Sequence, residues 1–212
     1  MSKPPDWASD TEQAVLDEAV ALAPELGWGP QMLAQAADAA GLSRPEAELL
    51  LPHGARDLAA LLSRRHDAKA MEALGETDAS KLKIRERIRA GVVARLDAAR
   101  AEEAAVRRWA GFMSLPLNLP LALRLVWESA DVIWRWAGDT ATDENHYSKR
   151  AILSGILISC LAIDLASGRE AALANLDRAI DRVMAYEKWK AGFKPADVAR
   201  DVAGALGRMR YR

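Results

Sequence analysis

Few residues in this chain have the types and spacing that enzyme chemistry needs. The three histidines, His53, His66 and His146, are far apart, and none lies three residues from a glutamate, as a di-iron site in a helical bundle requires. Cys160, the single cysteine, has no histidine near it in the sequence and lies in an apolar run, so we expect a small buried side chain. The sequence also lacks a glycine-rich phosphate loop and a nucleophile elbow. These observations predict a non-enzymatic protein with no metal and no cofactor.

Asp131 is a carboxylate in an unusually apolar setting, the segment LVWESADVIWRWAG. A buried carboxylate is costly unless it is paired or hydrogen-bonded, so we expect Asp131 to meet a cation. Lys149 and Arg150, at the start of the following helix, are the candidate partners. The structural interpretation is an ion pair that joins two helices, and the alternative is a catalytic acid.

Helices must position these residues, because the chain of 212 residues has no alternating segment that predicts a strand. We therefore expect an all-α fold. The first four predicted helices cover about 9–23, 30–41, 43–52 and 55–74. A fifth begins near residue 80, and a sixth passes through residues 106–109. The last four cover about 120–136, 145–168 and 170–190, and the segment from residue 195. This pattern divides the chain into an N-terminal unit (1–54), a helical ligand-binding domain (55–194) and a C-terminal amphipathic helix (195–212).

The stretch NHYSKRAILSGILISCLAIDLASG contains a run of thirteen uncharged residues, from Ala151 to Ile163. That run is shorter than the roughly 20 apolar residues that span a bilayer, yet it is more apolar than a surface helix. Small residues such as Gly155 and Cys160 lie among branched ones, which allows either close helix packing or space for a ligand. Core packing is the simpler interpretation of the pattern alone.

Residues 32–51 have helix-turn-helix spacing, with MLAQAADAAGLS followed by the short segment RPEAELLL. The pattern resembles the N-terminal domain of TetR-type repressors, which are all-α and keep a ligand cavity in a larger C-terminal domain. Residues 1–62, however, hold three basic side chains against ten acidic ones, and cations that contact phosphate supply most of the affinity for DNA. We expect no DNA binding, and a ligand-responsive repressor is the alternative function.

A longer match covers residues 116–151, PLNLPLALRLVWESADVIWRWAGDTATDENHYSKRA. It resembles the signature of the lipid-binding accessory proteins of ubiquinone (coenzyme Q) biosynthesis. The matching residues are Pro116, Asn118, Ala130, Asp131, Trp134, Gly138, Asp139, Asp143, Asn145, Tyr147, Lys149 and Arg150. The resemblance implies a TetR-like fold without DNA binding, an isoprenoid lipid bound in the C-terminal domain, membrane association, and assistance to the di-iron hydroxylase that acts on demethoxyubiquinone. It implies no catalytic activity.

The resemblance favours a lipid pocket, rather than ordinary packing, around the apolar helix. The ligand would be an isoprenoid quinone intermediate or a phospholipid. The candidate lining residues are Phe112, Leu125, Trp127, Ile133, Ile152, Ile156 and Ile163. His146, Tyr147 and Lys149 would contact the hydroxylase, although the family usually has an aromatic residue where this chain has His146.

The last segment, PADVARDVAGALGRMRYR, combines an apolar stripe with arginines. That layout is typical of an interfacial helix on a membrane, and also of a terminal helix that docks on its own domain or on a partner subunit. The N-terminal MSKPPDWASD lacks the apolar stretch of a signal peptide. We expect a cytoplasmic protein peripheral to the inner membrane, and a homodimer by analogy with TetR-like proteins.

Overall fold

The computed structural model describes residues 7–140 and 144–192, and this part of the chain contains helices and turns but no strand. The all-α expectation is therefore confirmed. The α-helices are α1 (Trp7–Leu26), α2 (Pro30–Ala39), α3 (Arg44–Leu50), α4 (Ala55–Ala73), α5 (Ile84–Arg100), α6 (Glu103–Met113), α7 (Leu119–Trp136), α8 (Glu144–Ser167) and α9 (Arg169–Gly192). A short 3₁₀ turn, η1 (Ala79–Lys81), precedes α5. The predicted C-terminal helix from residue 195 lies outside the described residues.

Local sequence sets several helix ends where the pattern predicted them. At the start of α3, the backbone amide of Ser43 donates to Glu46 Oε2 at 2.8 Å, which completes the predicted capping box. α2 ends just before Gly41, whose φ of +78° is a left-handed conformation that glycine adopts without steric cost. Capping residues and glycines therefore separate α2 from α3 as the sequence indicates.

Two helix starts differ from the prediction. α1 begins at Trp7, so Ser9 lies inside the first turn and does not cap it. α5 begins at Ile84 and not near Ser80, because Asp78 holds the intervening residues in the 3₁₀ turn. The Asp78 carboxylate accepts hydrogen bonds from Ser80 N at 3.0 Å and from Ser80 Oγ at 2.6 Å. A short polar side chain has here competed with the helix for the backbone amide.

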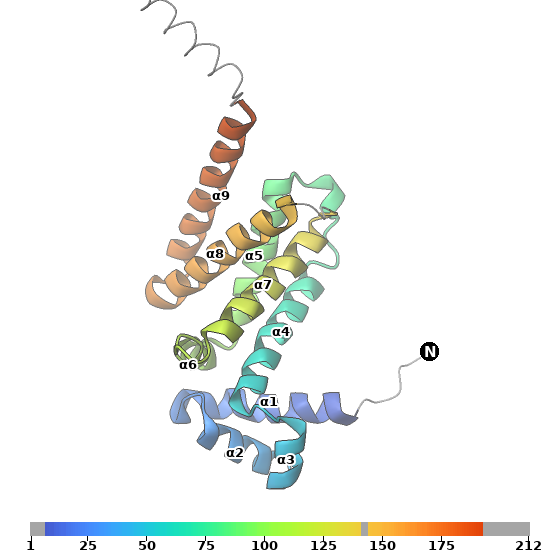
Figure 1. Ribbon diagram of the computed structural model, residues 1–212, viewed down its shortest axis with the longest axis vertical. Coiled ribbons are helices and arrows are strands. Elements are labelled where there is room, and N and C mark those ends of the chain that lie inside the picture. Colours follow the sequence, from blue (N-terminus) through green and yellow to red (C-terminus); the bar gives the residue numbers. More distant parts are fainter. Residues whose placement is uncertain (1–6, 141–143, 193–212) are drawn as a thin grey trace, which may run out of the picture.

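The helices form two hydrophobic cores, and α7 contributes to both. Figure 1 shows α1, α2 and α3 gathered at one end of the molecule, with α4 running from them along α7. The first core combines α1, α2 and α4 with side chains from α6 and α7, and Leu16 and Leu58 are fully buried in it. The second core lies among α5, α7, α8 and α9, around Val92, Ile133 and Leu176. Because α7 is shared, it ties the N-terminal helices to the rest of the domain.

α8 is longer than the run of thirteen uncharged residues that it contains. Its segment His146–Ser167 is long and apolar enough to cross a membrane by length and composition. In the structure α8 packs against α7 and α9, and Leu153 and Cys160 are buried in the second core. The buried carboxylate of Asp164 pairs with Arg100 of α5, with 3.1 Å between Oδ1 and Nη1. One side of α8 therefore belongs to the second core, while other apolar positions, such as Ile152 and Ile158, are 38% and 50% exposed.

A buried polar cluster joins α4 to the start of α6. His66 is 2% exposed, and its Nε2 lies 2.8 Å from Glu102 Oε2. Arg65 and Lys69 contact the same carboxylate at 3.1 and 3.0 Å. Burial lowers the pKa of His66 from 6.5 to about 4, and the hydrogen bond with His66 lowers the pKa of Glu102 from 4.5 to about 2. Both groups therefore take up protons more readily in the unfolded chain than in the folded protein.

We expect the free energy of unfolding to decrease as the pH falls below 6.5, because the unfolded chain protonates His66 first. His66→Gln should flatten the decline between pH 6.5 and pH 4, an effect of up to about 3 kcal/mol. Urea unfolding across this range measures it. His53→Gln, at an exposed position just before α4, is the control. A decline that persists unchanged in His66→Gln would contradict this assignment.

Candidate functional site

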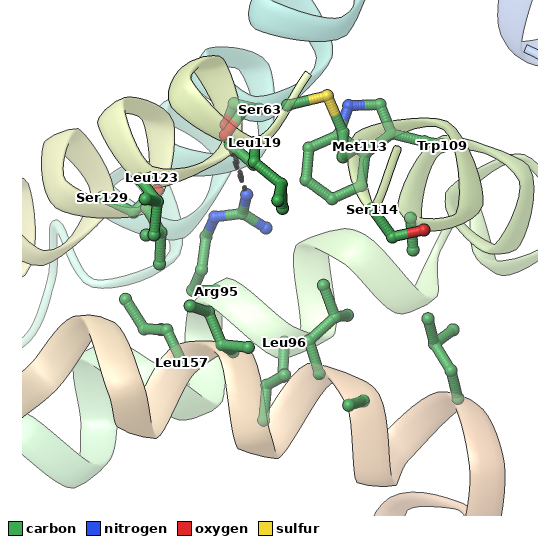
Figure 2. Close-up of a pocket in the computed structure, with 17 residues that line it drawn as sticks. Ser63, Arg95, Leu96, Trp109, Met113, Ser114, Leu119, Leu123, Ser129 and Leu157 are labelled. Atoms are coloured by element: carbon green, nitrogen blue, oxygen red, sulfur yellow. Dashed lines mark hydrogen bonds between the residues drawn. The ribbon is translucent and has the colours of Figure 1, made fainter. Parts of the chain in front are cut away.

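An apolar hollow of about 350 Å³, here called cavity I, lies between α5, α6, α7 and α8 (Figure 2). Its apolar lining consists of Leu96, Trp109, Ala110, Met113, Leu119, Ala122, Leu123, Val126, Leu157, Ile158, Leu161, Ala162 and Leu165. The polar lining residues are Ser63, Arg95, Ser114 and Ser129. Small-molecule pockets range from about 300 to 1,000 Å³, so cavity I fits a compact apolar ligand or one part of a longer one.

The turn between α6 and α7 positions much of this lining. α6 ends at Met113 before Pro116, and Pro120 lies in the first turn of α7. Asn118 fixes the turn between them by donating from Nδ2 to the Phe112 carbonyl at 2.8 Å. Arg56 of α4 donates through Nε to Asn118 Oδ1, also at 2.8 Å. Side chains from the last turn of α6 and the first turns of α7 consequently face the same hollow, as Figure 2 shows.

Apolar side chains surround the opening of cavity I to solvent. Its lining residues Leu119, Leu123 and Ile158 are 46%, 60% and 50% exposed. Leu115 and Leu117, in the turn before α7, are 52% and 81% exposed. Exposed apolar side chains that gather in one place indicate a binding surface, whereas scattered ones do not. The mouth of cavity I is therefore apolar on the inside and at its edge.

A small polar group forms one wall of cavity I. The Arg95 guanidinium lies in the hollow and points toward Ser63 (Figure 2), and its Nε donates to Asp67 Oδ1 at 2.6 Å. Arg95 Nη2 lies 3.3 Å from Ser63 Oγ, and Ser129 Oγ donates to Asp67 Oδ2 at 2.9 Å. Burial raises the pKa of Asp67, and the positive charge of Arg95 opposes that effect. Arg95 is the one charged side chain among the described residues that line cavity I.

A second hollow of about 430 Å³, cavity II, lies between α5, α7, α8 and α9. Its apolar lining includes Ile152, Ile156 and Ile180. Its charged lining residues are Arg85, Arg87, Asp139 and Lys149. An apolar ligand would leave these charged groups without water on one side, so cavity II suits such a ligand less well than cavity I.

Arg150 is buried at the junction of α7 and α8, where it is 2% exposed. Its Nε donates to Asp131 Oδ1 at 2.6 Å, and its Nη1 donates to Asp139 Oδ2 at 3.0 Å. Lys149 pairs with Asp139 instead of Asp131, at 2.7 Å. Burial raises the pKa of Asp139, but hydrogen bonds from Lys149 and Arg150 outweigh it and hold that pKa below its usual value. The structure thus contains the interhelical ion pair expected for Asp131, with Arg150 as the partner.

Aromatic side chains gather beside this ion pair and form what we call the aromatic edge: Trp127, Trp134, His146 and Tyr147. The Tyr147 side chain is 64% exposed, and its ring centroid lies 6.3 Å from that of Trp127 and 5.2 Å from that of His146. Lys149 Nζ lies 5.3 Å from the centroid of the Trp134 ring, within the range of a cation–π contact. The start of α8 therefore presents the exposed ring of Tyr147, with partly buried aromatic neighbours, beside the buried Arg150 ion pair.

Comparison with known proteins places these features in a family. The COQ9 family model matches residues 119–187, which include α7, α8 and most of α9. The protein named "Ubiquinone biosynthesis protein COQ9, mitochondrial" from Rattus norvegicus is 31% identical over 164 residues, which are 71% of this chain and 51% of that protein. The Homo sapiens protein of the same name is 30% identical over 164 residues, covering 71% and 50% of the two chains. The chain belongs to the COQ9 family.

Membership in the COQ9 family confirms the resemblance found in residues 116–151. A further relative with that name, from Xenopus tropicalis, is 29% identical over 156 residues, covering 68% of this chain and 48% of the relative. The chain therefore spans about half the length of the curated relatives it matches. The COQ9 family match contains the Asp131–Arg150 pair, the aromatic edge and the α7 and α8 walls of cavity I.

The seven residues predicted to line a lipid pocket are dispersed in the structure, and none of them lines cavity I. Ile152 and Ile156 line cavity II, whereas Phe112 and Leu125 pack in the first core and Ile133 packs in the second. Trp127 belongs to the aromatic edge, and the partly buried Ile163 lines neither cavity I nor cavity II. α8 turns Leu157, Ile158, Leu161, Ala162 and Leu165 toward cavity I. Because this helix is apolar on most sides, its sequence did not indicate which face would meet the hollow.

Arg95 was not among the predicted site residues, although its position relative to the apolar residues of α5 indicates a buried side chain. It follows Val92 by three residues and precedes Ala99 by four, so it lies on the face of α5 that carries the buried side chains. An arginine on a buried helix face needs a partner, which predicts a polar contact inside the domain. The identity of that partner, Asp67 of α4, could not be read from the sequence.

Proposed function

We propose that this chain is a non-catalytic lipid-binding protein of ubiquinone biosynthesis, and that it holds an isoprenoid quinone intermediate in cavity I. The observation that carries the proposal is an apolar cavity whose mouth is itself made of exposed leucines and an isoleucine. The assignment to this pathway rests on the names of the COQ9 relatives, which are ubiquinone biosynthesis proteins. A phospholipid is the other occupant that such a cavity could take.

The size of cavity I suits partial extraction of a lipid rather than complete enclosure. Moving hydrocarbon out of water gains about 0.8 kcal/mol per carbon, or roughly 3–4 kcal/mol per isoprene unit. A bilayer offers nearly the same gain, so the net preference for the protein is small. A hollow of about 350 Å³ holds the head of a polyprenyl lipid and the first part of its tail. The rest of the tail would pass over Leu119 and Leu123 and stay in the membrane.

The same proposal includes a membrane-peripheral location on the cytoplasmic side of the inner membrane, a TetR-like fold and a homodimer. DNA binding is not part of it, because the exposed side chains of α3 include Glu46, Glu48 and Leu49. Carboxylates and an 85% exposed leucine would face a polyanion there. Sedimentation velocity on the purified full chain tests the dimer.

Lipid extraction tests the main proposal. The purified protein is extracted with organic solvent, before and after incubation with phosphatidylcholine vesicles that contain ubiquinone, and the extract is analysed by mass spectrometry. We expect the extract to contain an isoprenoid quinone, in a molar ratio to the protein chain that approaches one. Failure to recover a quinone or any other isoprenoid under both conditions would overturn the proposal, and recovery of phospholipid alone would replace the proposed ligand.

The aromatic edge is the proposed contact for the di-iron demethoxyubiquinone hydroxylase, through His146, Tyr147 and Lys149. Exposed aromatic side chains on a rigid support are typical of interaction hot spots, whose truncation to alanine costs about 2 kcal/mol or more. We expect Tyr147→Ala to weaken binding to the purified hydroxylase at least about 30-fold, measured by calorimetry. Leu49→Ala, at an exposed apolar position on α3, is the control. Unchanged affinity in Tyr147→Ala would place the contact elsewhere.

A further inference from the structure

Arg95 has one hydrogen-bonding group that the protein leaves unused. Its Nε bonds to Asp67 and its Nη2 contacts the Ser63 hydroxyl, but Nη1 donates to no group within the described part of the chain. The side chain is nine-tenths buried, and Figure 2 shows the guanidinium directed into cavity I between the α7 and α8 walls. A neutral acceptor on a ligand would replace water at this N–H, and a hydrogen bond to a charged donor is favourable even after that exchange.

The charge on this wall is already balanced. The carboxylate of Asp67 lies 2.6 Å from Arg95 Nε, and both side chains are 10% exposed, so the pair is compact and close to neutral. The other polar lining residues, Ser63, Ser114 and Ser129, are uncharged. A phosphate group would bring a negative charge into an apolar cavity with no uncompensated cation to receive it, which is costly. A neutral oxygen acceptor can take the free N–H without that cost.

We propose that Arg95 Nη1 donates a hydrogen bond to a neutral ring carbonyl oxygen of the bound lipid, so that cavity I selects a quinone head group over a phosphate ester. This assignment rests on the proposed lipid-binding function of cavity I. It orients the ligand with its head against α5 and its tail toward Leu119, Leu123 and Ile158 at the mouth. Asp67 acts as a positioning residue, because it holds the guanidinium through Nε, and Ser129 holds Asp67 from α7.

Three probes with the same tail separate head-group recognition from apolar binding: decyl-benzoquinone, decylbenzene and decyl phosphate. Each is supplied in phosphatidylcholine vesicles, the vesicles are removed by ultracentrifugation, and the probe that remains with the full-length protein is quantified. We expect decyl-benzoquinone to be retained about tenfold better than decylbenzene, which is the effect of one charge-assisted hydrogen bond. Decyl phosphate should be retained less than decyl-benzoquinone.

Arg95→Lys is the decisive variant, because it keeps a cation beside Asp67 but loses the planar fork that places Nη1 in the cavity. It should reduce retention of decyl-benzoquinone to the level of decylbenzene and leave decylbenzene unchanged. Arg100→Lys is the matched control, since Arg100 also lies on α5 and pairs with a buried aspartate, Asp164, but does not line cavity I. Unchanged retention of the quinone by folded Arg95→Lys would overturn the proposal, as would Arg95-dependent preference for decyl phosphate.

Infrared spectroscopy of the wild-type protein tests the same contact without a variant. The carbonyl stretch of bound decyl-benzoquinone, isolated by ¹³C labelling, should lie at lower frequency than in the vesicle, because a hydrogen bond weakens the C=O bond. An unshifted band would overturn the role of Arg95 even if Arg95→Lys failed to fold. If wild-type protein retained none of the three probes, decylbenzene included, the lipid-binding function of cavity I would itself be wrong.

Discussion

Arg150→Met should lower the free energy of unfolding by about 3 kcal/mol, the largest effect we expect from a single charged residue in the described part of the chain. Arg150 is 2% exposed and bonds to Asp131 at 2.6 Å and to Asp139 at 3.0 Å. Removing the guanidinium leaves both carboxylates without their shared cation in a buried setting. The cost lies at the lower end of the usual range of about 3–5 kcal/mol, because Arg135 and Lys149 still contact them.

Arg135→Met is the matched control for this prediction. Arg135 Nε also bonds to Asp131, at 2.7 Å, but its side chain is 74% exposed. Solvent screens such a pair, so its loss should cost less than about 1 kcal/mol. Urea unfolding monitored by far-ultraviolet circular dichroism measures both variants. Equal losses in the two variants would show that burial of Arg150 does not determine the effect.

Ala162→Trp should reduce retention of an isoprenoid quinone at least about tenfold while the domain stays folded. Ala162 lines cavity I from α8, and its side chain is exposed, so the backbone does not have to move to accept a larger residue. The indole would occupy space that the ligand needs. Each ligand carbon that the indole displaces from cavity I into water loses about 0.8 kcal/mol of transfer free energy, so two such carbons are sufficient for a tenfold effect once the vesicles are removed.

Ala151→Trp controls for a new exposed aromatic residue, because Ala151 is also an exposed position on α8 but does not line cavity I. The measurement is quinone recovered by organic extraction after incubation with loaded vesicles, together with the urea midpoint of each variant. We expect both variants to unfold within about 1 kcal/mol of the wild type. Equal quinone recovery from Ala162→Trp and Ala151→Trp would exclude cavity I as the binding site.

Features that depend on neighbouring residues could be predicted from the sequence. Pro30 and Gly41 delimit α2, and Ser43 with Glu46 starts α3, because prolines, left-handed glycines and capping side chains act within a single turn of helix. For a similar reason, the sequence indicated two adjacent residues as candidate partners of Asp131 on the next helix. A carboxylate in an apolar segment must find a cation, and the next helix begins with Lys149 and Arg150.

Features that depend on how helices rotate about their axes required the tertiary structure. α8 is apolar on most sides, so its sequence could not show that Leu157, Leu161 and Leu165 line cavity I while Ile152 and Ile156 line cavity II. The partner of Arg95 was equally hidden, because Asp67 lies 28 residues earlier on another helix. Amphipathic periodicity fixes the buried face of a helix only when the opposite face is polar. The sequence by itself therefore determined the helices, several of their ends and the COQ9 family signature. The packing of α4 to α8 decided where an apolar cavity opens and which side chain projects into it.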